Sequence, residues 1–151
     1  MFAKLRAHFA ADTLESEADT SESLPLAAAM LLFEVAWADH DISSQEIDRI
    51  DASLQSLFGV SHGVAERLAE QARVEHVKAT SIYPFAREVR EALDADERFQ
   101  LMVALWQLAL ADELLATYEE SAIRRISELL YVSHRDFIRA KLEAKRATSS
   151  R

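Results

Sequence analysis

The sequence predicts an all-α protein, a single-domain bundle of about seven helices, and three observations indicate it. The 151 residues include only two glycines and two prolines, whereas β-turns depend on glycine at positive φ. Half of the residues are hydrophobic, which is typical of a chain with a folded core. Apolar residues recur with helical spacing between signals for helix starts and helix stops.

The first four helices follow from these signals in chain order. The first begins near Pro25 and is apolar almost all round, so we expect it at the centre of the bundle. The second presents one apolar face and ends at Gly59, a typical helix-stop residue. The third starts after Ser61, and the fourth opens at Pro84. The predicted ranges are 25–38, 44–57, 62–77 and 84–93.

Capping signals mark two of the last three helices. Asp94 and Glu97 have capping-box spacing and open a long helix. The final helix begins at Ser133, where Val132 and Phe137 have the spacing of a hydrophobic staple. The predicted ranges of these three helices are 94–111, 118–130 and 133–146.

Composition divides the chain into three segments. Residues 1–23 combine a short amphipathic stretch with an acidic, Ser-rich stretch that is typical of a flexible linker. Residues 24–146 form the helical domain, and we expect residues 147–151 to be a disordered tail. The apolar face of the amphipathic stretch carries Phe2, Leu5 and Phe9.

Charge and cysteine content exclude several classes of function. The net charge is −9, which argues against nucleic acid as a partner because phosphate binding relies on Lys and Arg. The charge is uneven: residues 12–51 hold eleven acids and one base, and residues 134–151 hold six bases and two acids. The chain has no cysteine, so disulfides, thiol catalysis and thiolate zinc sites are excluded.

No segment reads as a membrane span. The longest uncharged runs, 23–33 and 99–111, fall short of the roughly 20 residues that a bilayer requires. We therefore expect a cytoplasmic protein, with peripheral membrane contact through residues 1–10 as an alternative.

Two halves of the chain resemble each other. A shift of 73 places "LLFEVAWADHDISSQE" over "ALWQLALADELLATYE", so that Asp39 meets Asp112 and Glu46 meets Glu119. Farther on, a shift of 72 places "LFGVS" over "LLYVS". Each half reads as a buried helix, an acidic turn and an amphipathic helix. The pattern predicts two helix-pair repeats related by a pseudo-twofold axis.

The repeated pattern resembles the TerB-like (tellurite resistance protein B) helical domains, and it is close to an uncharacterised bacterial branch. The resemblance covers about residues 24–145. It is carried by "LLFEVAWADHDISSQE", "LWQLALADELLATYEESAIRRISELLYVS" and "HRDFIRAKL". It implies an all-helical bundle linked to tellurite resistance and stress response, with a divalent-cation role for acidic residues. The second motif departs from the family's Ala-Asp-Gly, because Glu113 follows Asp112 and Leu114 stands opposite Asp41.

The two acidic turns have two interpretations. Asp39 and Asp112 fall near helix C-termini, where the helix dipole disfavours a carboxylate by about 0.3–1 kcal/mol. A following helix N-terminus, a basic side chain or a bound cation should compensate. Carboxylates without thiolates favour hard ions such as Mg²⁺, Ca²⁺ or Mn²⁺. The alternative is helix capping, since Ser43 and Glu46 have capping-box spacing, as do Thr117 and Glu120. The candidate metal ligands are Asp39, Asp41, Glu46, Asp112, Glu119 and Glu120.

Three functions remain after these observations. We expect a non-enzymatic interaction or stress-response module with a protein partner and weak divalent-cation binding at the acidic turns. The alternative is a structural scaffold in which the acidic turns are helix caps, and a homodimer is compatible with both. A metal-dependent enzyme ranks last, because no nucleophile, general base or phosphate-binding loop accompanies the acids. We predict no catalytic residue and no organic cofactor.

Overall fold

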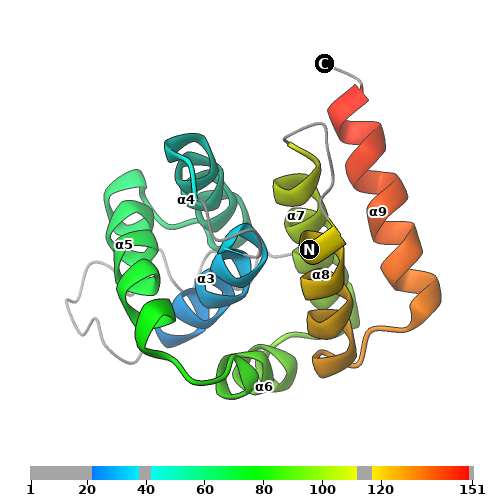
Figure 1. The fold of residues 1–151 in the computed structure, drawn as a ribbon, viewed down its shortest axis with the longest axis horizontal. Coiled ribbons are helices and arrows are strands. Elements are labelled where there is room, and N and C mark those ends of the chain that lie inside the picture. The colour runs from blue at the N-terminus through cyan, green and yellow to red at the C-terminus, as the bar shows by residue number, and fades with distance from the viewer. Residues whose placement is uncertain (1–21, 38–41, 112–116, 150–151) are drawn as a thin grey trace.

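The computed structural model describes residues 22–37, 42–111 and 117–149. This part of the chain contains seven helices and no strand, which confirms the predicted all-α fold. The helices are α3 (Ser23–Ala36), α4 (Ser44–Phe58), α5 (His62–Lys78), α6 (Tyr83–Ala92), α7 (Ala95–Leu110), α8 (Thr117–Leu129) and α9 (His134–Ser149), shown in Figure 1.

Local side-chain caps begin several helices where the sequence predicts them. Asp94 accepts a hydrogen bond from the amide of Glu97, and the Glu97 carboxylate accepts one from the amide of Asp94, each at 2.8 Å. Ser61 caps α5 and Ser133 caps α9 in the simpler way, through a side-chain oxygen that accepts an amide three residues on. These bonds satisfy amides that have no partner inside the helix.

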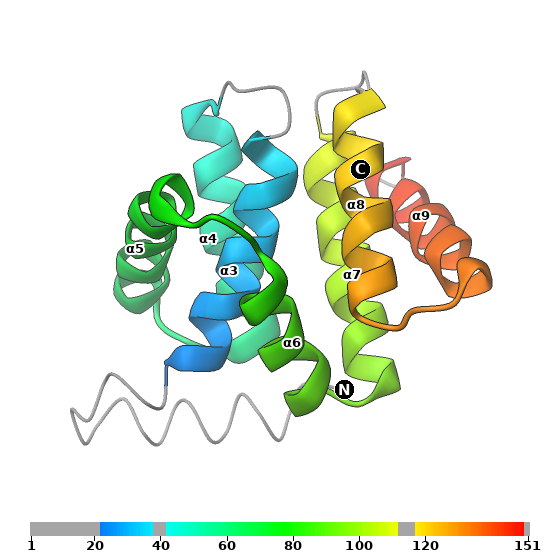
Figure 2. The ribbon, with the colours of Figure 1, turned by 60° about the horizontal axis from the view of Figure 1, so that its bottom comes forward.

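Two central helices, α3 and α7, organise the core. Figure 2 shows α3, α4 and α5 on one side and α7, α8 and α9 on the other, with α6 crossing below them. The α3 helix packs against all of α4 to α8, and α9 packs along the outer side of α7. Trp106 of α7 is fully buried, and its ring meets Phe137 of α9 edge-on at 5.2 Å. The Trp106 indole N–H also donates to the Phe137 carbonyl at 3.2 Å.

Some helix pairs recur in the two halves as the predicted repeat expects, but α4 packs closely on α5 whereas α8 and α9 lack an equally close packing. In one half α3 packs on α4 and α5, and in the other α7 packs on α8 and α9. Contacts between the halves also form a matching pair: the predicted pseudo-twofold axis would relate the contact of α3 with α8 to that of α7 with α4. Two residues related by the shift of 72, Gly59 and Tyr131, both have positive φ, at 70° and 58°. A superposition of the two halves remains a prediction.

Two expectations at helix ends differ from the structure. The α9 helix continues to Ser149, three residues past the expected boundary at 146, because no Gly or Pro follows to stop it. Trp37, which falls inside the predicted helix 25–38, lies just beyond the end of α3 and is 38% exposed. The expectations for residues 1–21 fall outside the described part of the chain.

Candidate functional site

The acidic residues predicted as metal ligands divide into two groups. Asp39, Asp41 and Asp112 lie outside the described residues. Glu46 is the third residue of α4 and is 5% exposed. One of its carboxylate oxygens accepts the Ser43 amide at 3.0 Å, and its own amide donates to the Ser43 hydroxyl at 3.1 Å. Glu46 is therefore the acid of a capping box, as the alternative interpretation of this turn expects.

Glu119 and Glu120 are neighbours in the first turn of α8 but have different surroundings. Glu119 is the third residue of its helix, like Glu46, and is 2% exposed. Glu120 is partly exposed, and its carboxylate lies 3.8 Å from the Lys141 ammonium of α9 and 4.0 Å from Arg124. The predicted cap by Thr117 cannot be compared, because that side chain lies outside the described part. The structure does not bring Glu119 and Glu120 together with Glu46 in one cluster of ligands.

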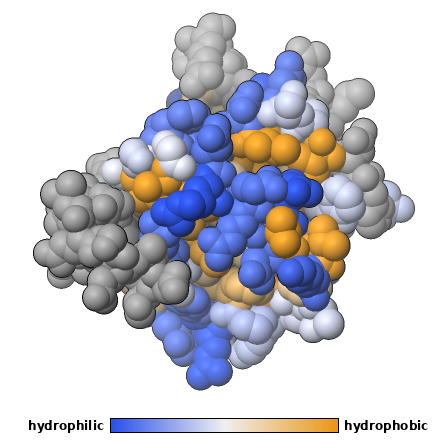
Figure 3. All heavy atoms as spheres, turned by 90° about the vertical axis from the view of Figure 1, so that its left-hand side faces the viewer, coloured by the Kyte–Doolittle hydropathy of each residue, from blue (hydrophilic) through white to orange (hydrophobic). Residues whose placement is uncertain are grey.

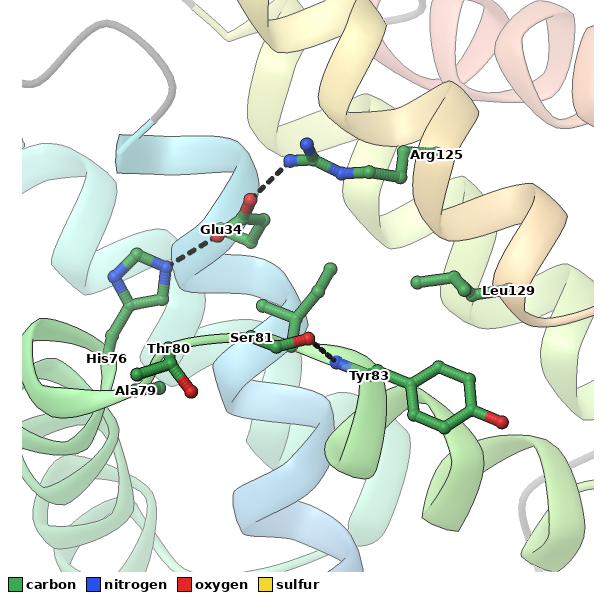
Figure 4. Close-up of a pocket in the computed structure, with 9 residues that line it drawn as sticks. Glu34, His76, Ala79, Thr80, Ser81, Tyr83, Arg125 and Leu129 are labelled. Carbon is green, nitrogen blue, oxygen red and sulfur yellow. Dashed lines mark hydrogen bonds and ion pairs between the residues drawn. The ribbon is translucent and has the colours of Figure 1, made fainter.

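A pocket of about 390 Å³ lies where α3, α5, α6 and α8 meet. A single acidic side chain, Glu34 of α3, lies at the centre of its polar wall. One Glu34 oxygen lies 2.7 Å from the His76 Nε2 atom of α5, and the other accepts a hydrogen bond from Arg125 of α8, as Figure 4 shows. The remaining polar and aromatic lining includes Thr80, Ser81 and Tyr83.

The two partners shift the titration of Glu34. The hydrogen bond with His76 is the largest cause, and it holds the pKa of Glu34 below its ordinary value of 4.5. The positive charge and hydrogen bond of Arg125 act in the same direction, while burial of the carboxylate opposes them. Glu34 is therefore ionised at neutral pH, and it joins α3 and α5 of one half to α8 of the other.

The chemistry of this pocket is that of a bridge between helices. His76 directs its Nε2 atom at Glu34, and the Ser81 hydroxyl accepts the Tyr83 amide at 3.0 Å, so the two side chains do not form a nucleophile–base pair. No sequence motif marks these residues as a site. The signal available was Glu34 itself, a lone acid inside the apolar run "AMLLFEVAWA".

A second cluster lies between α4 and α5. Asp51, His62 and Glu66 each direct one ligand-type atom to a common region, where the three atoms lie within 4.8 Å of one another. Within the described ranges this is the one group of three side chains that could hold a metal ion. None of the six predicted ligands belongs to it.

The sequence of this domain matches a known protein family. The family model described as tellurite resistance protein TerB matches residues 25–142, which is most of the chain. The chain belongs to the TerB family. Neither the curated proteins nor the solved structures yield a match. None of the described helices is both long enough and apolar enough to cross a bilayer.

Proposed function

We propose that this TerB-family domain is a non-enzymatic interaction module that serves the response to tellurite or metal stress. The observation that carries the proposal is the outer face of α9. The α9 helix packs mainly on α7 and meets α8 through the Lys141–Glu120 ion pair. Its buried stripe is narrow and consists of Phe137, Ala140 and Ala144.

The side of α9 away from α7 combines aliphatic and basic side chains. Ile138 is 38% exposed and Leu142 is 54% exposed, and the two lie one helical turn apart. Two exposed bases flank them, Arg135 and Lys145, whereas Arg139 stacks on Phe99 of α7 and pairs with Asp136. We define the α9 outer face as Arg135, Ile138, Leu142 and Lys145.

Charge complementarity indicates the kind of partner. The α9 outer face carries two positive charges on a chain whose net charge is −9, so an acidic partner would meet less repulsion there than on the acidic parts of the surface. Two aliphatic side chains are enough to seat one apolar edge of a helix but offer little surface to insert into a bilayer. The occupant we propose is an acidic, amphipathic helical segment of another protein.

Three further observations bear on the proposal. On the side of the molecule formed by α5, hydrophilic side chains predominate and apolar atoms form separate patches (Figure 3). The pocket around Glu34 lacks the paired nucleophile and base that hydrolytic or transfer chemistry uses. The capping role of Glu46 supports the structural interpretation of the first acidic turn over the cation-binding one.

The test compares two variants with matched exposure. Ile138→Ser with Leu142→Ser removes the aliphatic part of the α9 outer face. Val74→Ser with Val77→Ser removes a comparable exposed pair, at 38% and 74%, from α5. Both variants should keep the far-UV circular dichroism and melting temperature of the wild type, because the changed side chains are exposed.

The readout is residue-resolved cross-linking of the full chain in its cell lysate, followed by affinity measurement with each captured acidic segment. We expect cross-links on α9. The affinity for the captured segment should fall at least ~10-fold in the α9 variant but not in the α5 variant. A 10-fold loss is equivalent to the ~1.4 kcal/mol of a buried aliphatic contact. Equal affinity of both variants contradicts the proposal. Binding to anionic vesicles instead of a protein segment would also overturn it.

A further inference from the structure

The turn between α4 and α5 brings three metal-ligating side chains together. Gly59 ends α4 in the left-handed conformation, and Ser61 caps α5 two residues later. The tight reversal lays the first turns of α5, with His62 and Glu66, beside Asp51 of α4. All three residues therefore lie on helices whose ends are locally capped, which limits how far their backbones move.

Burial makes Asp51 the fixed member of this cluster. The Asp51 side chain is 9% exposed, whereas those of His62 and Glu66 are 69% and 74% exposed. One Asp51 oxygen accepts a hydrogen bond from Gln55 at 3.0 Å, and the other lies 3.3 Å from the Nδ1 atom of His62. A carboxylate oriented by a neighbouring amide is the arrangement found around metal ligands, where outer groups hold the ligand in position.

The start of α9 resembles the start of α5 but lacks one of these carboxylates. Under the shift of 72, His134 corresponds to His62, and its helix begins with the same kind of serine cap. Ile138 stands there at the position of Glu66. A serine-capped helix start with a histidine therefore forms without a glutamate one turn later, so this local structure does not require Glu66.

We propose that Asp51, His62 and Glu66 bind a divalent ion of the Zn²⁺ class. One imidazole with two carboxylates suits Zn²⁺ and its transition-metal neighbours, whereas Mg²⁺ and Ca²⁺ prefer oxygen ligands alone. Three protein ligands leave a fourth position for water. With a neutral imidazole the cluster carries a charge of −2, which a divalent ion neutralises.

One of the distances already matches a tetrahedral site. Metal–ligand bonds of about 2 Å put neighbouring ligand atoms about 3.3 Å apart, and the Asp51–His62 separation is 3.3 Å. Glu66 lies 3.7 Å from the other ring nitrogen, Nε2. One ion uses one ring nitrogen, so Glu66 must swing toward the Asp51 side, and its exposed side chain is free to rotate there.

Calorimetric titration of the full chain with Zn²⁺ tests the site. We expect His62→Ala and Glu66→Gln each to weaken the strongest Zn²⁺ binding by at least ~10-fold, the lower end of the loss seen when only an outer-shell partner of a metal ligand is removed. Both side chains are exposed, so neither variant should lose stability. The matched control is His134→Ala, which should bind Zn²⁺ like the wild type. Excess Mg²⁺ should not compete.

NMR of the histidine side chains identifies the site independently of affinity. The imidazole resonances of His62 should respond to one equivalent of Zn²⁺ before those of His76 and His134 do. Equal Zn²⁺ affinity in the wild type and His62→Ala would overturn the proposal, as would a first response at another histidine or no binding to the wild type. None of these outcomes depends on the partner proposed for α9.

Discussion

Two turns between helices, at Gly59 and at Tyr131, reach the same left-handed conformation with different residues. At the first helix turn, Gly59 supplies the left-handed conformation directly. At the second, Tyr131 adopts φ of 58°, which is costly for a residue with a Cβ atom. Neighbouring arginines support the second turn: Arg90 stacks on the Tyr131 ring at 4.4 Å, and Arg98 donates to the Leu130 carbonyl at 3.1 Å.

The interface of the following helix differs in the same way. The residues of α5 that face the core are Ala65, Leu68, Ala69 and Ala72. The corresponding stripe on α9 has Phe137 at the position of Ala65, and small residues follow it. The α5 helix thus packs on both α3 and α4, whereas α9 packs mainly on α7, with Phe137 as its one large fully buried side chain against Trp106. We therefore expect α9 to be more sensitive than α5 to the loss of a single side chain.

Truncating that large side chain should have the largest effect. Phe137→Ala removes a buried ring and leaves a cavity beside Trp106, which should lower the free energy of unfolding by about 3–5 kcal/mol. Chemical denaturation followed by tryptophan fluorescence measures the loss. The exposed neighbour Ile138→Ala is the control and should change stability by less than about 0.5 kcal/mol. A loss below about 1 kcal/mol for Phe137→Ala would show that α9 is held by other contacts.

Removing the charge that joins the halves should have the next largest effect. Glu34→Gln weakens the bridge to His76 and Arg125, and we expect a loss of about 1–2 kcal/mol at neutral pH, below the full value of charged hydrogen bonds because Arg125 is exposed. The measurement is the denaturation midpoint of both proteins across pH.

The pH dependence distinguishes this bridge from a simple packing effect. Because the folded-state pKa of Glu34 lies below its ordinary value of 4.5, its stabilisation is complete above that value. It is lost as the pH falls through the lowered pKa. The difference between wild type and Glu34→Gln should therefore shrink in acid. A difference that stays constant from neutral pH into acid would contradict the ionic role of Glu34.

The two left-handed residues give a smaller and asymmetric effect. Gly59→Ala should destabilise by about 1–2 kcal/mol, the cost of that conformation for a residue with a Cβ atom. Tyr131→Gly relieves the same strain but loses the Arg90 stacking, worth about 0.5–1 kcal/mol, and adds the flexibility of glycine to the unfolded chain. We expect its stability to change by less than about 1 kcal/mol. Thermal melts of both variants provide the measurement. If Arg90 contributes nothing, Tyr131→Gly should raise the melting temperature by about as much as Gly59→Ala lowers it.

The acidic turns should produce the smallest effect. If Asp39 and Asp41 bind Mg²⁺, Ca²⁺ or Mn²⁺ weakly, the gain is about 0.4 kcal/mol when the free ion equals its dissociation constant. The melting temperature should rise with the divalent salt but not with K⁺ at matched ionic strength. Asp39→Asn with Asp41→Asn should abolish this rise, while Asp112→Asn should change it little, since Leu114 stands where the first turn has Asp41. If the melting temperature responds equally to both salts, the cation-binding interpretation is wrong and only the capping interpretation remains.

Local features were predictable from the sequence because their causes lie within one helical turn. The capping boxes at Ser43 and Asp94, and the stop at Gly59, depend on residues no more than four positions apart. Helical spacing and the shortage of glycine and proline were enough for the all-α fold, and the quoted motifs were enough for the TerB family, which the family comparison confirms.

The polar clusters depended on tertiary structure. Glu34 meets His76 and Arg125 across 42 and 91 residues of sequence, and no local pattern links them. Asp51 and His62 face each other because the turn at Gly59 sets the orientation of α5 relative to α4. By itself the sequence determined the helices, their caps and the family, since backbone hydrogen bonds and apolar periodicity act over a few residues. Which charges meet was decided by the packing of whole helices, because rotating a helix by a fraction of a turn would separate every one of these pairs.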